Sequence, residues 1–190
     1  MGTLVKQQIL VLFIGAAAFL AGGCSCQHTP DRHPVTVSLG AGFTRPQAIE
    51  VHIFAANAQL SPEWESVSMS KYWGASDRER AQKFREKSMY VMHFGIDRPT
   101  SQTFSPQTTP EEWKQLWATW EQQKAVKLFI FAYLPSDPSQ PFEDKAGSLD
   151  ARRLVIPLDK CKWENPQQPL DVTITPARIE LVTQQAEKKK

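Results

Sequence analysis

The stretch AVKLFIFAYLP (residues 125–135) decides the fold of this chain of 190 residues. Its side chains are apolar almost without interruption, with Lys127 as the only charged one. A strand of this composition is typically buried on both faces of its sheet, because neither face alternates with polar residues. We therefore expect residues 125–135 to form a central strand.

Shorter strands are expected on both sides of this stretch. In AIEVHIFAA (residues 48–56), Ile49, Val51 and Ile53 face one side, while the other side carries Glu50, His52 and Phe54. This alternation predicts a half-buried strand. Further segments with strand character are VTVSL (35–39), SMYVMHF (88–94), RRLVIPL (152–158), LDVTIT (170–175) and RIELVT (178–183), the last two separated by Pro176 in a tight turn.

The clearest helix is TPEEWKQLWATWEQQ (residues 109–123). Thr109 is expected as its N-cap, Pro110 at its first position, and Glu112 as the partner in a capping box. An apolar stripe with helical spacing predicts that one face packs against a core sheet; the alternative is an exposed protein-binding face. The stripe consists of Trp113, Leu116, Trp117 and Trp120.

The remaining segments are helical insertions and loops. Residues 61–74 and 76–85 carry short helical patterns, and residues 95–109 and 136–150 are predicted as loops. Strands outnumber helices and the last strands have short connections. The fold class is therefore expected to be mainly β, a β-sandwich with short helical insertions, formed as a single domain by residues 35–183.

The N-terminus has the pattern of a secretory signal in residues 1–23. Lys6 precedes the apolar run of residues 9–20, which is too short to span a bilayer comfortably. Small residues then lead directly to Cys24, and this resembles the bacterial lipobox, although Ala21 stands where leucine is usual. The resemblance implies that Cys24 is acylated, becomes the mature N-terminus and anchors the protein to a lipid bilayer.

Two other interpretations of the N-terminus remain open. Ordinary cleavage near Gly23 would leave a soluble secreted protein, and the apolar run could instead persist as an uncleaved anchor. In the sorting pattern of enterobacterial lipoproteins, Ser25 after the cysteine favours the outer membrane over the inner membrane. Residues 24–34 are polar and are expected to form a flexible tether, and residues 184–190 a basic C-terminal tail.

The remaining cysteines, Cys26 and Cys161, form an even pair in an oxidising compartment. They are a candidate disulfide; the alternative is a free thiol at Cys26 and a buried Cys161. Cys24, Cys26 and His28 have the spacing of metal ligands, but we expect no metal there, because Cys24 would be acylated.

Composition and motifs give no sign of catalysis or of nucleic-acid binding. The chain carries 22 Lys and Arg against 20 Asp and Glu, a net charge of +2. It has no nucleophile elbow, phosphate-binding loop or zinc-protease motif, and we expect no enzymatic activity and no cofactor. His52 and His93 could meet across a sheet. Lys145, Arg152 and Arg153 would suit a phosphate, but charge protecting an edge strand explains them more simply.

The order of these elements resembles the TssJ-type outer-membrane lipoproteins of type VI secretion systems. The resemblance rests on VHIFAA (51–56), the insertion PEWESVSMSKYW (62–73), FIFAYLP (129–135) and ARRLVIP (151–157). The family's F-x-x-A-D element and its Trp before Arg are absent. The resemblance implies a transthyretin-like sandwich without enzymatic activity, which tethers the periplasmic part of an inner-membrane protein to the outer membrane through a loop such as 97–109 or 136–150.

The sequence thus predicts a lipid-anchored periplasmic protein that binds a partner in an envelope assembly. Two alternatives are an envelope enzyme with an unrecognised site and a passive structural lipoprotein. A concave pocket that holds His52 or His93 together with a carboxylate of raised pKa would favour the enzyme.

Overall fold

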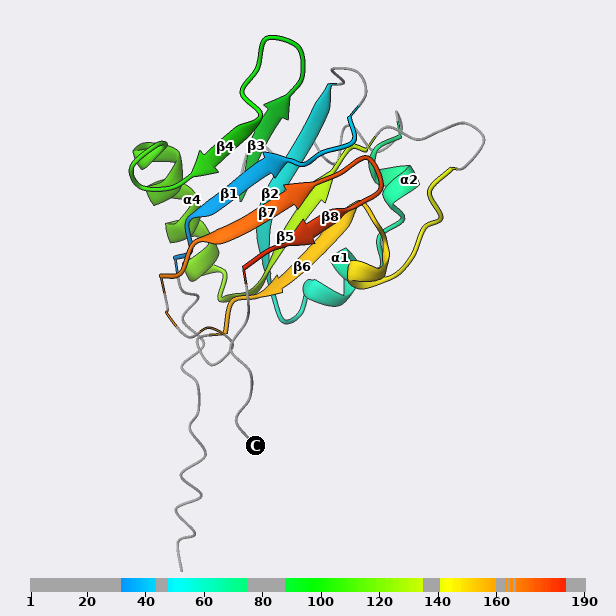
Figure 1. Cartoon of the computed structure of the whole chain (residues 1–190). Coiled ribbons are helices and arrows are strands. Elements are labelled where there is room, and N and C mark those ends of the chain that lie inside the picture. The colour runs from blue at the N-terminus through cyan, green and yellow to red at the C-terminus, as the bar shows by residue number, and fades with distance from the viewer. Residues whose placement is uncertain are drawn as a thin grey trace, which may run out of the picture.

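Two four-stranded sheets pack face to face in this protein (Figure 1). The structure is a computed structural model that describes residues 32–43, 48–74, 88–134, 141–159, 163, 165 and 167–183. The predicted β-sandwich is confirmed. The signal sequence, the helical pattern at residues 76–85 and the C-terminal tail at residues 184–190 lie outside the described residues.

The first sheet has the strand order β4-β1-β7-β8. Strands β1 and β7 pair in parallel, and the other neighbours pair antiparallel. The strands are β1 (Val35–Leu39), β4 (Ser101–Phe104), β7 (Leu170–Ile174) and β8 (Ile179–Leu181).

The second sheet is antiparallel throughout, in the order β3-β2-β5-β6. Its strands are β2 (Ile49–Asn57), β3 (Met89–Phe94), β5 (Ala125–Ala132) and β6 (Arg153–Pro157). Strand β5 lies between β2 and β6, which confirms the central position predicted for residues 125–135.

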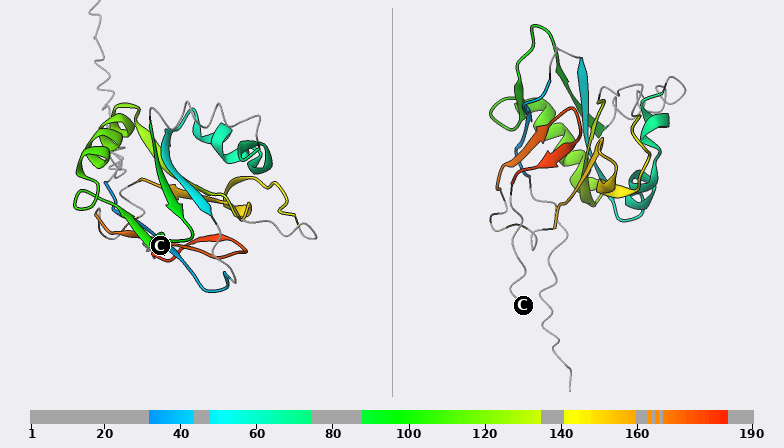
Figure 2. Two further views of the ribbon diagram at one scale, coloured as in Figure 1. Left: turned by 90° about the horizontal axis from the view of Figure 1, so that it is seen from above. Right: turned by 45° about the vertical axis from the view of Figure 1, so that its right-hand side comes forward.

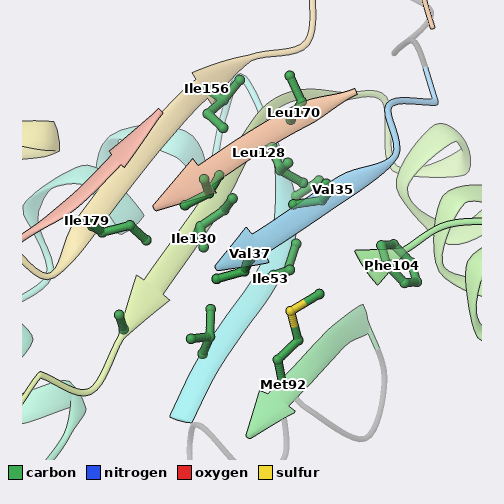
Figure 3. Close-up of a cluster of buried hydrophobic side chains, with 14 of the residues drawn as sticks. Val35, Val37, Ile53, Met92, Phe104, Leu128, Ile130, Ile156, Leu170 and Ile179 are labelled. Carbon is green, nitrogen blue, oxygen red and sulfur yellow. The ribbon is translucent and has the colours of Figure 1, made fainter. Parts of the chain in front are cut away.

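Apolar side chains from both sheets fill the space between them (Figure 3). Val35 and Val37 of β1 point toward Ile53 of β2 and toward Leu128 and Ile130 of β5 (Figure 3). All five are inaccessible to solvent. This apolar layer is the main driving force for association of the two sheets.

A second apolar cluster covers the outer face of the β3-β2-β5-β6 sheet. The short helices α1 (Ser61–Ser66) and α2 (Met69–Tyr72) place Trp64 and Tyr72 over Phe54 and Phe131. The half-buried strand predicted for residues 48–56 is therefore wrong, because the helical layer buries the second face of β2 as well. The predicted alternation of the side chains between the two faces of this strand is correct.

Helix α4 (Pro110–Gln122) closes one side of the sandwich beside β3 and β4 (Figure 2). The Trp113 ring lies 4.8 Å from the ring of Phe104 in β4, and Trp120 Nε1 donates to the Ser88 carbonyl at 2.9 Å. Trp117 is completely buried. The stripe is therefore core, as the first of the two interpretations predicted. Thr109 precedes the helix as expected, but its hydroxyl donates to the Ser105 carbonyl and forms no capping box.

The predicted loop at residues 95–109 contains strand β4, which corrects that prediction. The strand is short and polar, so alternation does not reveal it, and it is held by pairing with β1. Hydroxyl groups add to this pairing: Ser101 Oγ lies 2.8 Å from Ser38 Oγ, and Thr103 Oγ1 lies 3.1 Å from Thr36 Oγ1.

The first described residues, Arg32 and His33, contact the folded domain. Residues 24–31 of the predicted tether lie outside the described residues, whereas Arg32 pairs with Glu121 of α4 and the buried His33 ring bonds the Gln168 carbonyl through Nδ1. The beginning of β1 and the end of β8 lie at the same end of the sandwich, and the loop between β3 and β4 lies at the opposite end (Figure 1).

Candidate binding surface

The predicted lipidation and disulfide sites are not covered by the structure. Cys24, Cys26, His28 and Cys161 all lie outside the described residues. Acylation of Cys24 and pairing of Cys26 with Cys161 therefore stay predictions. Within the described ranges, no group of histidine, cysteine and carboxylate side chains is arranged to hold a metal ion, and no helix is long and apolar enough to cross a membrane.

The two strand histidines meet through a carboxylate. The register of β2 and β3 sets Glu50 opposite His93, and His52 follows on the same face of β2. Glu50 Oε1 lies 2.5 Å from His52 Nε2, and Glu50 Oε2 lies 3.8 Å from His93 Nδ1. His52 Nδ1 lies 2.5 Å from the Tyr72 hydroxyl. The sequence pattern indicates both histidines but neither Glu50 nor Tyr72 as site residues, because nothing in the spacing shows that α2 folds over β2.

This network links the sheet to the helical layer. If the Tyr72 hydroxyl donates to Nδ1 and Nε2–H donates to Glu50, neutral His52 uses both ring nitrogens. The imidazole is only 1% exposed, with the Trp73 ring 4.7 Å from it. A buried polar side chain is stable only when its polar atoms are paired, and these contacts meet that condition for His52.

Arg152 is the centre of a second polar network, which joins three segments of chain. Its Nε and Nη2 donate to the Asp150 carboxylate at 3.0 and 2.9 Å, and Nη2 also donates to Asp144 Oδ1 at 2.6 Å. Nη1 donates to Ser70 Oγ of α2 at 3.2 Å. Asp144 in turn accepts from Ser68 Oγ and from the Ser70 amide. The guanidinium thus fastens α2 to the segment before β6.

The network shifts the ionisation of all three charged groups. Burial alone would raise the pKa of Asp150 and of Asp144, but hydrogen bonds from Arg152, and for Asp144 mainly from Ser68 and Ser70, lower both pKa values below their ordinary range. Burial would likewise lower the pKa of Arg152, but the two carboxylates raise it. All three groups are therefore charged at neutral pH, and the two carboxylates exceed the charge of the one guanidinium.

These shifts predict an acid-sensitive contribution to stability. A carboxyl group whose pKa is depressed by folding stabilises the protein above its unfolded pKa, about 3.9, and this stabilisation is lost as the pH falls through the folded value. We expect the free energy of unfolding, measured by urea titration, to fall as the pH drops below about 4. In Asp150→Ala this decrease in the free energy of unfolding with falling pH should be smaller. An identical pH profile for the variant would contradict the lowered pKa of Asp150.

Arg153 and Lys145 do not share the environment of Arg152. Arg153 is 1% exposed, and its guanidinium donates to the carbonyls of Glu65 and Val67 at the end of α1. Burial lowers the pKa of Arg153. Lys145 pairs with Glu143 in solvent, its Nζ 3.3 Å from Oε2. The expected edge-protecting role of Arg153 is wrong because its charge is buried, and the three basic side chains do not form one anion site.

A hollow of about 250 Å³ opens beside the Arg152 network. Trp73 and Tyr133 form part of its wall, with their rings 5.5 Å apart, and Phe142 lies 5.5 Å from the Arg152 guanidinium. Tyr133 is 49% exposed. The lining consists of Ser70, Trp73, Gly74, Tyr133, Leu134, Pro141, Phe142 and Arg152, and it includes neither predicted histidine.

Exposed apolar side chains lie beside or within the two loops that were predicted to bind a partner. Ile96, just before the 97–109 segment, is 68% exposed, and Asp97 beside it has a positive φ of 59°. In the 136–150 segment Leu149 is largely exposed; residues 136–140 lie outside the described part of the chain. Pro141 and Phe142 of the same segment line the hollow.

Comparisons with known proteins include a remote likeness to a solved structure. No protein-family model matches the chain, and no curated protein matches it. Among solved structures, Lip of Serratia marcescens, a membrane bound component of the Type VI Secretion System, aligns with a TM-score of 0.42 and 9% sequence identity. The alignment covers 82% of this chain and 98% of Lip. A likeness of this degree carries no inference about function.

Proposed function

We propose that the protein is a lipid-anchored component of the bacterial cell envelope that binds a protein partner and catalyses no reaction. The observation that carries the proposal is the position of Cys24, directly after a short apolar run and three small residues. A single acyl chain binds membranes only marginally, at about 0.8 kcal/mol per buried CH₂ group, whereas several chains on one cysteine would make the anchor effectively permanent.

The shape of the domain supports a tethered, partner-binding role. Seven residues separate Cys24 from Arg32, so even an extended chain reaches at most about 30 Å. An anchor at Cys24 would therefore keep the end of the sandwich near residue 32 close to the lipid. The β3–β4 loop with Ile96 lies at the opposite end, where a partner could reach it (Figure 1).

The environment of the histidines supports binding over catalysis. His52 is buried beneath α2, and the hollow is not lined by His52 or His93. A general acid or base has to lie within hydrogen-bonding reach of its substrate. We therefore favour a non-enzymatic role over an envelope enzyme that uses these histidines.

The finer assignment is an outer-membrane protein of a type VI secretion membrane complex, facing the periplasm. It rests on the lipobox-like pattern, on Ser25 and on the motif resemblance described for residues 51–56, 129–135 and 151–157. Recovery of an inner-membrane secretion component by affinity purification from crosslinked envelopes would support it. A deletion strain without any secretion or envelope defect would favour a passive structural lipoprotein instead.

The anchoring itself is tested with Cys24→Ser. We expect the native protein in the membrane fraction, with a mature N-terminus at residue 24 whose mass includes fatty acids, because the thiol is the site of acylation. The variant should lose the fatty acids and leave the membrane fraction. Cys26→Ser is the matched control and should behave like the native protein. A native chain that starts at another residue and carries no fatty acid would refute the proposal.

A further inference from the structure

Two turns lie side by side at the end of the sandwich where β1 begins. Arg32, the first described residue, pairs with Glu121 near the end of α4 at 2.7 Å. Strand β5 begins at Ala125, which the sheet register sets beside Asn57, the last residue of β2. The turn from β2 to α1 and the turn from α4 to β5 are therefore neighbours at this end (Figure 1).

The first turn exposes an apolar side chain where a helix start favours polar ones. Leu60 directly precedes α1 and is 44% exposed. Ser, Thr, Asp and Asn are favoured at this position, because their side chains accept hydrogen bonds from the first helical amides, which leucine cannot do. The turn is nevertheless fixed, since Asn57 Oδ1 accepts from the amides of Gln59 and Leu60 at 3.1 and 2.9 Å. An apolar group is thus held in solvent.

The second turn carries a lysine in a conformation that lysine rarely adopts. Lys124 follows α4 with a φ of 55°, in the left-handed region where glycine or asparagine is usual after a helix. Its amide donates to the Glu121 carbonyl at 2.9 Å, and its side chain is exposed. Two adjacent turns thus present an apolar and a cationic side chain that their own backbones do not favour.

The surface of a phospholipid bilayer accepts both of these chemistries. Apolar side chains enter the boundary between headgroups and acyl chains, and lysine keeps its ammonium group at the level of the headgroups. An acylated Cys24 would hold this end within about 30 Å of the lipid. A contact too weak to bind a free protein becomes populated once the protein is tethered, because the second binding event is then intramolecular.

Carboxylates among the described residues near this end limit the role of net charge. Arg32 is paired with Glu121, and Glu63 in the first turn of α1 and Asp159 after β6 are negative. The contact therefore depends on the apolar group and on the headgroup phosphates, which zwitterionic phospholipids also carry. It does not need an excess of anionic lipid.

We propose that the end of the sandwich with Leu60 and Lys124 rests on the phospholipid bilayer that anchors Cys24. Leu60 lies at the boundary between headgroups and acyl chains, and Lys124 lies at the headgroup phosphates. This orientation rests on the proposed lipid anchor and adds a second contact with the same membrane. It directs the β3–β4 loop, at the opposite end, away from the lipid (Figure 1).

The test uses the full chain, purified from membranes and reconstituted in phosphatidylcholine vesicles that contain a lipid with a nitroxide on its headgroup. A fluorescent label is attached through Gln123→Cys beside Lys124 or through Ile96→Cys in the β3–β4 loop, each combined with Cys26→Ser and Cys161→Ser. We expect the nitroxide to quench the label at residue 123 at least threefold more than the label at residue 96. Equal quenching, or stronger quenching at residue 96, would overturn the orientation.

Leu60→Asn separates direct contact from tethering alone. Asparagine is favoured before a helix, so the variant should unfold at no lower a midpoint than the native protein, which is measured in parallel. We expect it nevertheless to reduce the quenching of the label at residue 123 at least twofold, whereas Ile96→Asn should leave that quenching unchanged. Unchanged quenching in a folded Leu60→Asn protein would show that Leu60 does not contact the lipid, and the proposed contact would fail.

Flotation of the same vesicles separates this contact from the proposed function. Protein that floats with the vesicles but is quenched equally at residues 96 and 123 is anchored by its lipid alone, so the orientation fails while the anchor stands. Protein that does not float has no anchor, and then both proposals fail. Flotation together with selective quenching at residue 123 supports both.

Discussion

Trp117→Ala is expected to destabilise the protein by about 3–5 kcal/mol, the usual cost of removing a fully buried tryptophan. Trp117 is completely buried, and its ring centroid lies 5.3 Å from that of Trp113 and 4.9 Å from that of Trp120. The loss would be a large part of a typical total stability of about 5–15 kcal/mol. Urea unfolding followed by circular dichroism measures it.

The control for this prediction lies on the same helix. Gln115 is exposed, and Gln115→Ala should change the free energy of unfolding by less than about 0.5 kcal/mol. A cost below about 1 kcal/mol for Trp117→Ala would show that α4 does not pack with this face toward the core.

The neighbouring tryptophans also allow a comparison of their indole N–H groups. Trp120 Nε1 donates to the buried Ser88 carbonyl at 2.9 Å, whereas Trp117 Nε1 has no partner among the described residues. Trp120→Phe should therefore cost about 1–3 kcal/mol more than Trp117→Phe, because only the former leaves a buried acceptor unpaired. Equal costs would contradict the role of this hydrogen bond.

Asp150→Ala is the second change with a large expected effect, about 3–5 kcal/mol. The Asp150 carboxylate is buried and accepts from the guanidinium and amide of Arg152 and from the amide of Lys145. Among the described residues, its removal leaves the buried Arg152 with only Asp144 as an ionic partner. Thermal and urea unfolding at neutral pH measure the loss.

Two further variants test whether an unpaired charge is the cause. Asp144 also binds Arg152 but has a side chain that is 37% exposed, so Asp144→Ala should cost less than half as much as Asp150→Ala. Adding Arg152→Met to Asp150→Ala should recover part of the stability, because the stranded charge is removed. If the double variant is less stable than Asp150→Ala alone, the loss does not come from an uncompensated charge.

Parts of the fold that depend on a continuous apolar pattern could be predicted well. Residues 125–135 carry apolar side chains on both faces, so a central position is needed to bury both faces, and β5 (Ala125–Ala132) occupies that position. The spacing of Trp113, Trp117 and Trp120 sets one face of α4 against the core for the same reason. In both cases the pattern of apolar side chains along the segment predicts which faces are buried.

Predictions failed where a polar residue is buried through a distant partner. His52 and Glu50 made the second face of β2 look solvated, but Tyr72, twenty residues further along the chain, helps to satisfy the imidazole and lets α2 cover it. Arg153 looked like an exposed edge charge, but carbonyls at the end of α1 pair with it. Strand β4 was missed because four residues with mostly polar side chains show no period.

The sequence by itself determined which segments are strands of the interior and which face of α4 is buried. Only the tertiary structure decided what covers the outer face of β2 and β5 and which residues line the hollow. Trp73, Tyr133, Phe142 and Arg152 come from separate segments, so no spacing along the chain connects them. Apolar burial can be inferred from each residue's own chemistry, whereas a buried polar group or a binding surface depends on partners that only folding brings together.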